Sequence, residues 1–129
     1  MYLLDTNAVA ALMKKHPNFI QHFYRELPEN IAIPAVVWAE IQYGIYKNGS
    51  SKIKKFCDDL VKLIKILPLD QQVAEAFGKL KADNEKQGKN LSSFDMLIAS
   101  FAYLYDAILI TNDQAFYNIQ YIQVEDWTK

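Results

Sequence analysis

The chain has 129 residues, of which 51% are hydrophobic and 22% are charged, and its formal net charge is −1 at pH 7. This length and balance predict one soluble globular domain over residues 1–129 and exclude a disordered chain. The near-neutral charge argues against indiscriminate binding of nucleic acid, which strong positive charge drives, but it leaves room for a nucleic-acid enzyme with a local basic face.

The first half of the chain alternates short apolar strands with helices. Residues 2–4 form a strand that ends at Asp5, and Thr6 or Asn7 then caps a helix to about residue 14. Pro17, a favoured first-turn residue, begins a second helix that reaches about residue 26. The following elements are a strand over 31–33, an apolar helix over 35–46, and a serine-capped helix to about residue 63.

The second half continues the same alternation. A strand over 64–67 precedes a helix that Asp70 caps and that Gly88 ends near residue 87. Ser92 opens a helix to residue 105, and strands follow over 108–111 and 121–124. Short strands that alternate with helices predict an α/β fold, here a three-layer sandwich around a central, mainly parallel sheet of four to five short strands.

No feature predicts a membrane span, a disulfide or a zinc site. The apolar stretch over 96–105 is far shorter than the roughly 20 residues of a spanning helix, and Asp5 interrupts the apolar N-terminal run that a signal segment would need. We therefore expect a cytoplasmic protein. Cys57 is the single cysteine, and His16 and His22 are spaced to lie on different faces of a helix, so we interpret both histidines as solvated or packing residues.

Four acidic residues are expected at the same edge of the sheet. Ligands of open parallel sheets bind beyond the carboxyl ends of the strands. Asp5 ends the first strand, Asp113 follows the fourth, and Glu40 lies in the early turns of the helix after the second. Asp95 is in the first turn of a helix that should run antiparallel to the fourth strand, so it reaches the same edge from the other direction.

Each acid also has a purely structural explanation. Asp95 follows Ser92 by three positions, the spacing of a capping box, and Asp5 or Asp113 could cap the next element. Glu40 could simply reach solvent. Four independent coincidences would be needed, however, to place all of them at one edge.

The surroundings of these acids favour a metal site. Apolar residues flank Glu40 and Asp95, which predicts partly buried carboxylates, and no lysine or arginine adjoins any of the four. Crowded carboxylates without a cation repel one another and their pKa values rise. Mg²⁺ or Mn²⁺ relieves this repulsion, prefers oxygen ligands, and bridges carboxylates to a substrate phosphate.

Four segments around these acids resemble the motifs of PIN domains: residues 4–7, 36–44, 94–99 and 109–116. The resemblance covers the whole chain and is greatest to the VapC-type toxins of bacterial and archaeal toxin–antitoxin pairs. It implies a Mg²⁺- or Mn²⁺-dependent endoribonuclease that acts on RNA, forms a homodimer, and is inhibited by a small cognate antitoxin.

The resemblance also assigns roles to residues. Asp5, Glu40, Asp95 and Asp113 match the acidic quartet of the family; Asp5 and Asp95 are implied as direct metal ligands, and Glu40 and Asp113 as ligands through water. Asn112 is an alternative bearer of the role of Asp113. The motifs contain four supporting residues: Thr6, Asn7, Thr111 and Asn112.

The leading hypothesis is RNA hydrolysis by a water that one or two cations activate. The alternative is a non-catalytic PIN-like module that binds RNA or protein. A phosphotransfer or phosphatase domain is disfavoured, because Asn7 stands where such domains usually carry a second aspartate.

Three further expectations concern surfaces. A lysine cluster is interpreted as a solvated helix face: Lys52, Lys54, Lys55, Lys62 and Lys65. Four lysines, of which Lys52 also belongs to this cluster, are candidates for RNA contacts around the rim: Lys14, Lys47, Lys52 and Lys89. An apolar groove beside Ile45 and Tyr46 is the expected place for an antitoxin segment. Gly44 would either keep space open over Glu40 or serve helix packing.

Overall fold

The computed structural model describes residues 1–129 and is built around a five-stranded sheet in the order β3-β2-β1-β4-β5. Every pair of neighbouring strands is parallel. The strands are β1 (Tyr2–Leu4), β2 (Ile31–Pro34), β3 (Lys65–Leu67), β4 (Ile108–Ile110) and β5 (Gln123–Glu125). The predicted α/β class and the parallel sheet are therefore confirmed.

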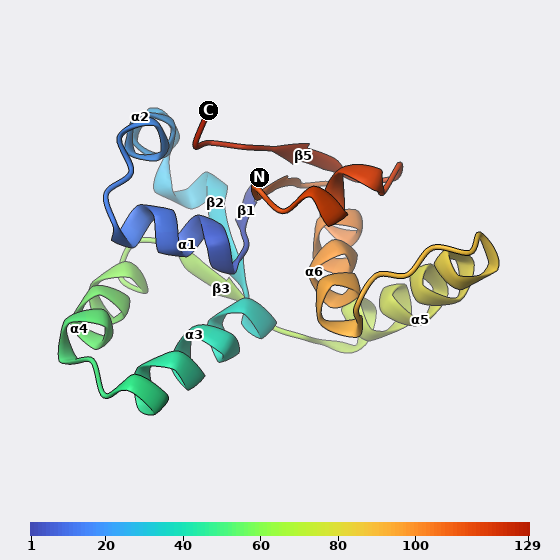
Figure 1. Ribbon diagram of the computed structural model, residues 1–129, viewed down its shortest axis with the longest axis horizontal. Helices are drawn as coiled ribbons and strands as arrows, with labels where there is room; N and C mark the ends of the chain where they lie inside the picture. Colours follow the sequence, from blue (N-terminus) through green and yellow to red (C-terminus); the bar gives the residue numbers. More distant parts are fainter.

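Helices cover both faces of the sheet. They are α1 (Thr6–Met13), α2 (Pro17–Arg25), α3 (Ala35–Asn48), α4 (Ser51–Leu60), α5 (Gln71–Lys86) and α6 (Ser93–Leu104). In Figure 1, α1, α2 and α4 lie on one side of the strands and α5 and α6 on the other, while α3 contacts both α1 and α6. The three-layer arrangement is thus confirmed.

The boundaries differ from the sequence prediction at a few positions. Asp5, rather than Thr6 or Asn7, caps α1, because its extended backbone places the side-chain oxygen Oδ1 2.8 Å from the amide of Ala8. The helix α4 ends at Leu60 instead of residue 63, and β5 begins at Gln123 instead of residue 121. Two 3-10 helices were not predicted: η1 (Pro28–Asn30) and η2 (Gln114–Asn118).

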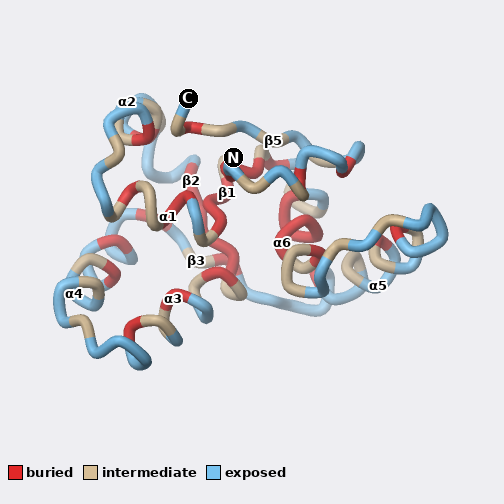
Figure 2. Tube along the Cα trace, viewed as in Figure 1, coloured by how far each residue is buried: buried red, intermediate tan, exposed pale blue.

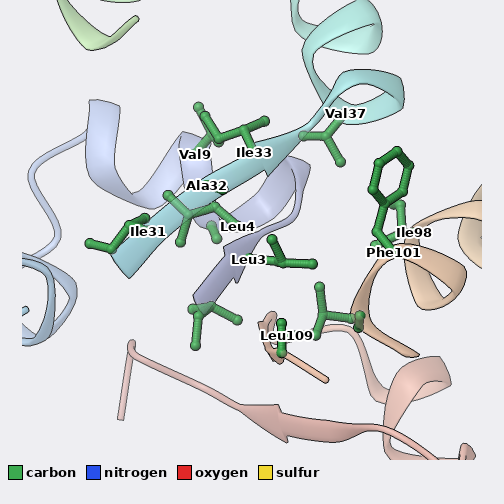
Figure 3. Packing of buried hydrophobic residues seen from close by; sticks show 14 of the residues in the cluster. Leu3, Leu4, Val9, Ile31, Ala32, Ile33, Val37, Ile98, Phe101 and Leu109 are labelled. Atoms are coloured by element: carbon green, nitrogen blue, oxygen red, sulfur yellow. The ribbon is translucent and has the colours of Figure 1, made fainter. Parts of the chain in front are cut away.

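The central strands are buried on both faces, which explains their continuous apolar sequences. Leu3 and Leu4 of β1 have no exposed surface, and the buried residues gather along β1, β2 and α6 in Figure 2. Figure 3 shows Leu3 pointing toward the side where Ile98 and Phe101 of α6 pack. A single cluster of 30 buried residues therefore joins the sheet to its helices and holds the strand ends in fixed positions.

The residues that we interpreted as structural have structural roles. The Nδ1 atom of His16 accepts a hydrogen bond from the amide of Phe19 at 3.4 Å and so caps α2. The ring of His22 stacks on Trp127 with a centroid distance of 5.7 Å. The clustered lysines are all exposed, and two of them pair along α4 with Asp58 and Asp59. The interpretation as one helix face is wrong for two of them, because α4 ends before Lys62, and Lys65 begins β3. None of the helices combines the length and the apolar character that crossing a bilayer requires.

Candidate active site

The order of the strands creates a crevice at the centre of the sheet. From β1 the chain moves outward through β2 and β3 on one side, and later returns to β4 and β5 on the other. Open parallel sheets bind ligands where the direction of winding reverses in this way. Asp5 follows β1 and Asp113 follows β4 soon after its end, so two of the predicted acids lie at the reversal.

All four predicted acids line one pocket of about 150 Å³: Asp5, Glu40, Asp95 and Asp113. Thr6 and Asn7 contribute to the same pocket, and its apolar wall consists of Phe94, Ile98 and Phe116. Figure 1 shows how the first turns of α1, α3 and α6 approach one another near the carboxyl ends of the strands. The expectation that the acids converge at one edge of the sheet is therefore confirmed.

Asp5 is the most buried of the four, with 4% of its surface exposed. Burial raises the pKa of its carboxyl group to about 6, from an ordinary value of 3.8. Hydrogen bonds from Thr111 and from the amide of Ala8 oppose this rise, whereas the negative charges of Asp113 and Asp95 add to it. The hydrogen bonds thus fix the carboxyl group in place, while burial and the neighbouring negative charges destabilise its ionised form.

Asp95 and Asp113 are partly buried, and each takes part in a cap. The amide of Asp95 donates to Oγ of Ser92 at 3.1 Å, and burial raises the pKa of the Asp95 carboxyl group, with the charge of Asp113 contributing. Oδ1 of Asp113 accepts from the amide of Ala115 at 3.0 Å at the start of η2. Asp95 and Asp113 therefore take part in helix caps and also line the acidic pocket.

Glu40 differs from the other three because its side chain is exposed. Its apolar neighbours had predicted a partly buried carboxylate, and for Glu40 this prediction is wrong. The buried positions of α3 are Val37, Ile41 and Ile45, which recur every four residues and leave Glu40 on a different face of the helix. Glu40 consequently stands at the mouth of the pocket.

The supporting residues connect the loops that carry the acids. Nδ2 of Asn7 donates to Oδ1 of Asn112 at 3.1 Å and joins the segments after β1 and β4. Oγ1 of the buried Thr111 accepts from the amide of Asp113 at 3.0 Å. Oγ1 of Thr6 is buried and has no hydrogen-bond partner within the protein.

Sequence reasoning missed Tyr117. Its hydroxyl donates to the backbone oxygen of Thr111 at 3.2 Å, so it braces the residue that binds Asp5. Burial, together with the charges of nearby acids that include Asp5, raises the pKa of the Tyr117 hydroxyl. Its contact with Thr111 depends on the turn made by η2, which gave no recognisable signal in the sequence.

The chemistry of the pocket fits a partly hydrated dication. Its polar side chains all offer oxygen atoms, and no lysine, arginine or histidine lines it. No three histidine, cysteine or acidic side chains lie close enough to one another to bind the same ion directly, so the pocket does not fit an ion with three such direct ligands. Mg²⁺ commonly keeps several waters and binds one or two carboxylates directly, which this arrangement permits. The buried Thr6 hydroxyl lines the pocket as a further oxygen and has no hydrogen-bond partner within the protein.

A groove of about 360 Å³ adjoins the pocket, and Glu40 and Thr6 line both. Ile41, Ile45 and Tyr43 form part of its wall, but Tyr46 does not and points into solvent with 79% of its surface exposed. An added Cβ at Gly44 would meet no atom within 4 Å, so glycine is not needed there for close packing within the chain.

Comparison with known proteins gives full-length matches. The family profile described as PIN domain matches residues 2–120. Ribonuclease VapC2 of Rickettsia felis is 31% identical over 133 residues, which span 100% of this chain and 99% of that protein. Ribonuclease VapC1 of Haemophilus influenzae strain R2866 is also 31% identical, with 100% and 99% covered. The crystal structure of VapBC2 from Rickettsia felis bound to a promoter DNA fragment superposes with a TM-score of 0.86 at 30% identity over 98% of each chain.

Proposed function

Because the chain belongs to the PIN-domain family and is related to VapC ribonucleases along its whole length, we propose that it is a Mg²⁺- or Mn²⁺-dependent endoribonuclease and the toxin of a toxin–antitoxin pair. One observation carries the proposal. The carboxylates of Asp5, Glu40, Asp95 and Asp113 line a single pocket that contains no cationic side chain. Such a pocket attracts a dication and, with it, a phosphate.

The division of roles follows the family pattern. Asp5 and Asp95 are the proposed direct ligands, and Glu40 and Asp113 act through water. When bound, a dication offsets the negative charge of the scissile phosphate and lowers the pKa of a water molecule. Glu40 makes no hydrogen bond through its side chain and stands at the pocket mouth, where it can orient a water or accept a proton.

The remaining residues of the pocket position these acids. The bond between Asn7 and Asn112 fixes the distance between the loops after β1 and β4. The caps at Ala8 and Ala115 orient the carboxylates of Asp5 and Asp113. Fixed ligands lower the reorganisation that binding requires, which favours the reactive arrangement.

The test is cleavage of structured RNA by the purified chain with Mg²⁺ or Mn²⁺. We expect the cleavage rate to fall by at least about 10²-fold in Asp5→Asn and in Asp95→Asn. Replacing a residue that only orients a metal ligand already lowers metal affinity or activity by about 10–100-fold, and a direct ligand should matter more. Asp70→Asn is the matched control, because Asp70 caps α5 as Asp5 caps α1 but lies outside the pocket.

The outcomes separate the candidate functions. Undiminished cleavage by both pocket variants would end the assignment. RNA binding that persists in a chelator, with no cleavage in either metal, would instead support the non-catalytic module. Cleavage that requires the metal and is lost only in the pocket variants supports the endoribonuclease.

The partners follow from the same relatives. We propose that a small antitoxin inhibits the chain by placing an apolar segment in the groove beside Glu40, which Ile41 and Ile45 line. We also expect a homodimer, which sedimentation of the purified chain measures directly.

A further inference from the structure

A second cavity, of about 700 Å³, lies beside the acidic pocket. It is open to solvent and is lined by the end of α5, by the segment that leads into α6, and by η2 with the residues after it. These segments lie at the right of Figure 1. The volume is in the range of roughly 300–1,000 Å³ that binds small organic ligands, and is large enough for a nucleotide.

The cavity adjoins the acids through two short connections. Ala115 lines the cavity, and its amide donates to Oδ1 of Asp113 at 3.0 Å. Leu91 also lines it, and the next residue, Ser92, caps the helix that carries Asp95. Residues that line the cavity are therefore bonded to, or adjoin in sequence, residues that hold Asp113 and Asp95.

Carboxamide side chains give this cavity its chemistry. Asn84, Asn90, Asn118 and Gln120 line it, and no carboxylate does. Asn84 is buried and uses its Nδ2 atom to hold the backbone oxygen of Lys89 at 3.3 Å. The side chains of the other three make no hydrogen bond within the protein, although surface amides in turns usually bind their own backbone.

A carboxamide both donates and accepts hydrogen bonds, as the edges of nucleobases do. Unpaired RNA bases are typically recognised by such groups together with an aromatic ring on which the base stacks. Tyr117 lines the cavity with 42% of its surface exposed, and its hydroxyl is anchored on Thr111. The Nζ atom of Lys89 contacts the backbone oxygen of Asn118 at 3.4 Å and keeps further donors for a phosphate.

We propose that this cavity binds one unpaired nucleobase of the substrate RNA, next to the phosphodiester at the acids, and so selects the cleavage site. Asn90, Asn118 and Gln120 read the edge of the base, Tyr117 offers its ring, and Lys89 neutralises the adjoining phosphate. The inference rests on the proposed ribonuclease function, because it assigns the base to the RNA that the acids cleave.

The experiment measures binding separately from cleavage. In the Asp95→Asn background, fluorescence anisotropy compares short single-stranded oligonucleotides of A, C, G and U in EDTA. We expect a preference for one base that falls by at least about tenfold in Asn118→Ala/Gln120→Leu, since each of the two base-edge contacts that are lost discriminates by roughly that factor. The control is Asn30→Ala/Gln72→Leu, which changes exposed amides away from the cavity.

A second variant guards against a folding defect. Gln120→Glu keeps the size of the side chain but removes a donor and adds a charge, so it should weaken binding of every oligonucleotide while the circular dichroism spectrum is unchanged. In the active protein, sequencing of the cleavage products should show that Asn118→Ala/Gln120→Leu broadens the choice of cleavage site.

The results distinguish the two proposals. Equal base preference in the cavity and control variants would overturn the base site. A cavity variant with a changed oligomeric state but unchanged RNA preference would also overturn it, and would assign the cavity to contacts between subunits. Cleavage that survives Asp5→Asn, combined with loss of base preference in the cavity variant, would refute the ribonuclease mechanism but leave the base site standing.

Discussion

Replacing Asp5 by asparagine should stabilise the metal-free protein, although it destroys the proposed active site. Burial raises the pKa of the Asp5 carboxyl group from 3.8 to about 6. Because the folded state then binds the proton more tightly than the unfolded state does, the contribution of Asp5 to stability is greatest below pH 3.8 and falls as the pH rises to about 6. One pKa unit corresponds to about 1.4 kcal/mol, so the ionised carboxylate costs about 3 kcal/mol at neutral pH.

Asparagine removes this cost and keeps the cap of α1, since its Oδ1 atom can still accept from the amide of Ala8. The gain in the free energy of unfolding is about 3 kcal/mol if both hydrogen bonds of Asp5 survive, and about 1–2 kcal/mol if one is lost. The difference in the free energy of unfolding between the variant and the wild type should grow by about 2 kcal/mol from roughly pH 4.5 to 7.5. Other groups titrate alike in both proteins, so their contributions cancel in this difference.

The assay is urea unfolding of both proteins in EDTA at these two pH values. Adding Mg²⁺ should then raise the stability of the wild type more than that of Asp5→Asn, because only the wild type keeps the full set of carboxylates. A stability difference that is the same at both pH values, or a variant that is less stable than the wild type at neutral pH, would refute the electrostatic account.

Three further predictions concern positioning and packing. Ser92→Ala removes the cap of α6, and Ser50→Ala removes the equivalent cap of α4, so each should lower the free energy of unfolding by about 1 kcal/mol. Only Ser92→Ala should slow RNA cleavage at saturating metal, because Ser92 holds the amide of Asp95. Tyr117→Phe removes the hydrogen bond to Thr111 and should cost about 1 kcal/mol in urea unfolding together with a measurable loss of cleavage rate. Phe101→Ala opens a cavity at a residue with no exposed surface and should cost about 3–5 kcal/mol, whereas Tyr46→Ala on the exposed face of α3 should change stability by less than about 0.5 kcal/mol.

The sequence by itself determined the elements and the edge at which the acids meet. Apolar runs, prolines and capping residues predicted every strand and helix except the two 3-10 helices, because these signals act over a few neighbouring positions. Since Asp5 and Asp113 follow strand ends and Asp95 begins the helix before β4, their common edge required only that the sheet be parallel.

Only the tertiary structure decided how these residues meet. The pairing of β1 with β4, which brings Asp5 beside Asp113, joins segments about a hundred positions apart, and so does the hydrogen bond from Asn7 to Asn112. The exposure of Glu40 depended on which face of α3 packs inward, and the amide-lined cavity on how η2 folds back against the end of α5. Long-range packing of this kind is set by the free energy of the whole core, which no local pattern of residues encodes.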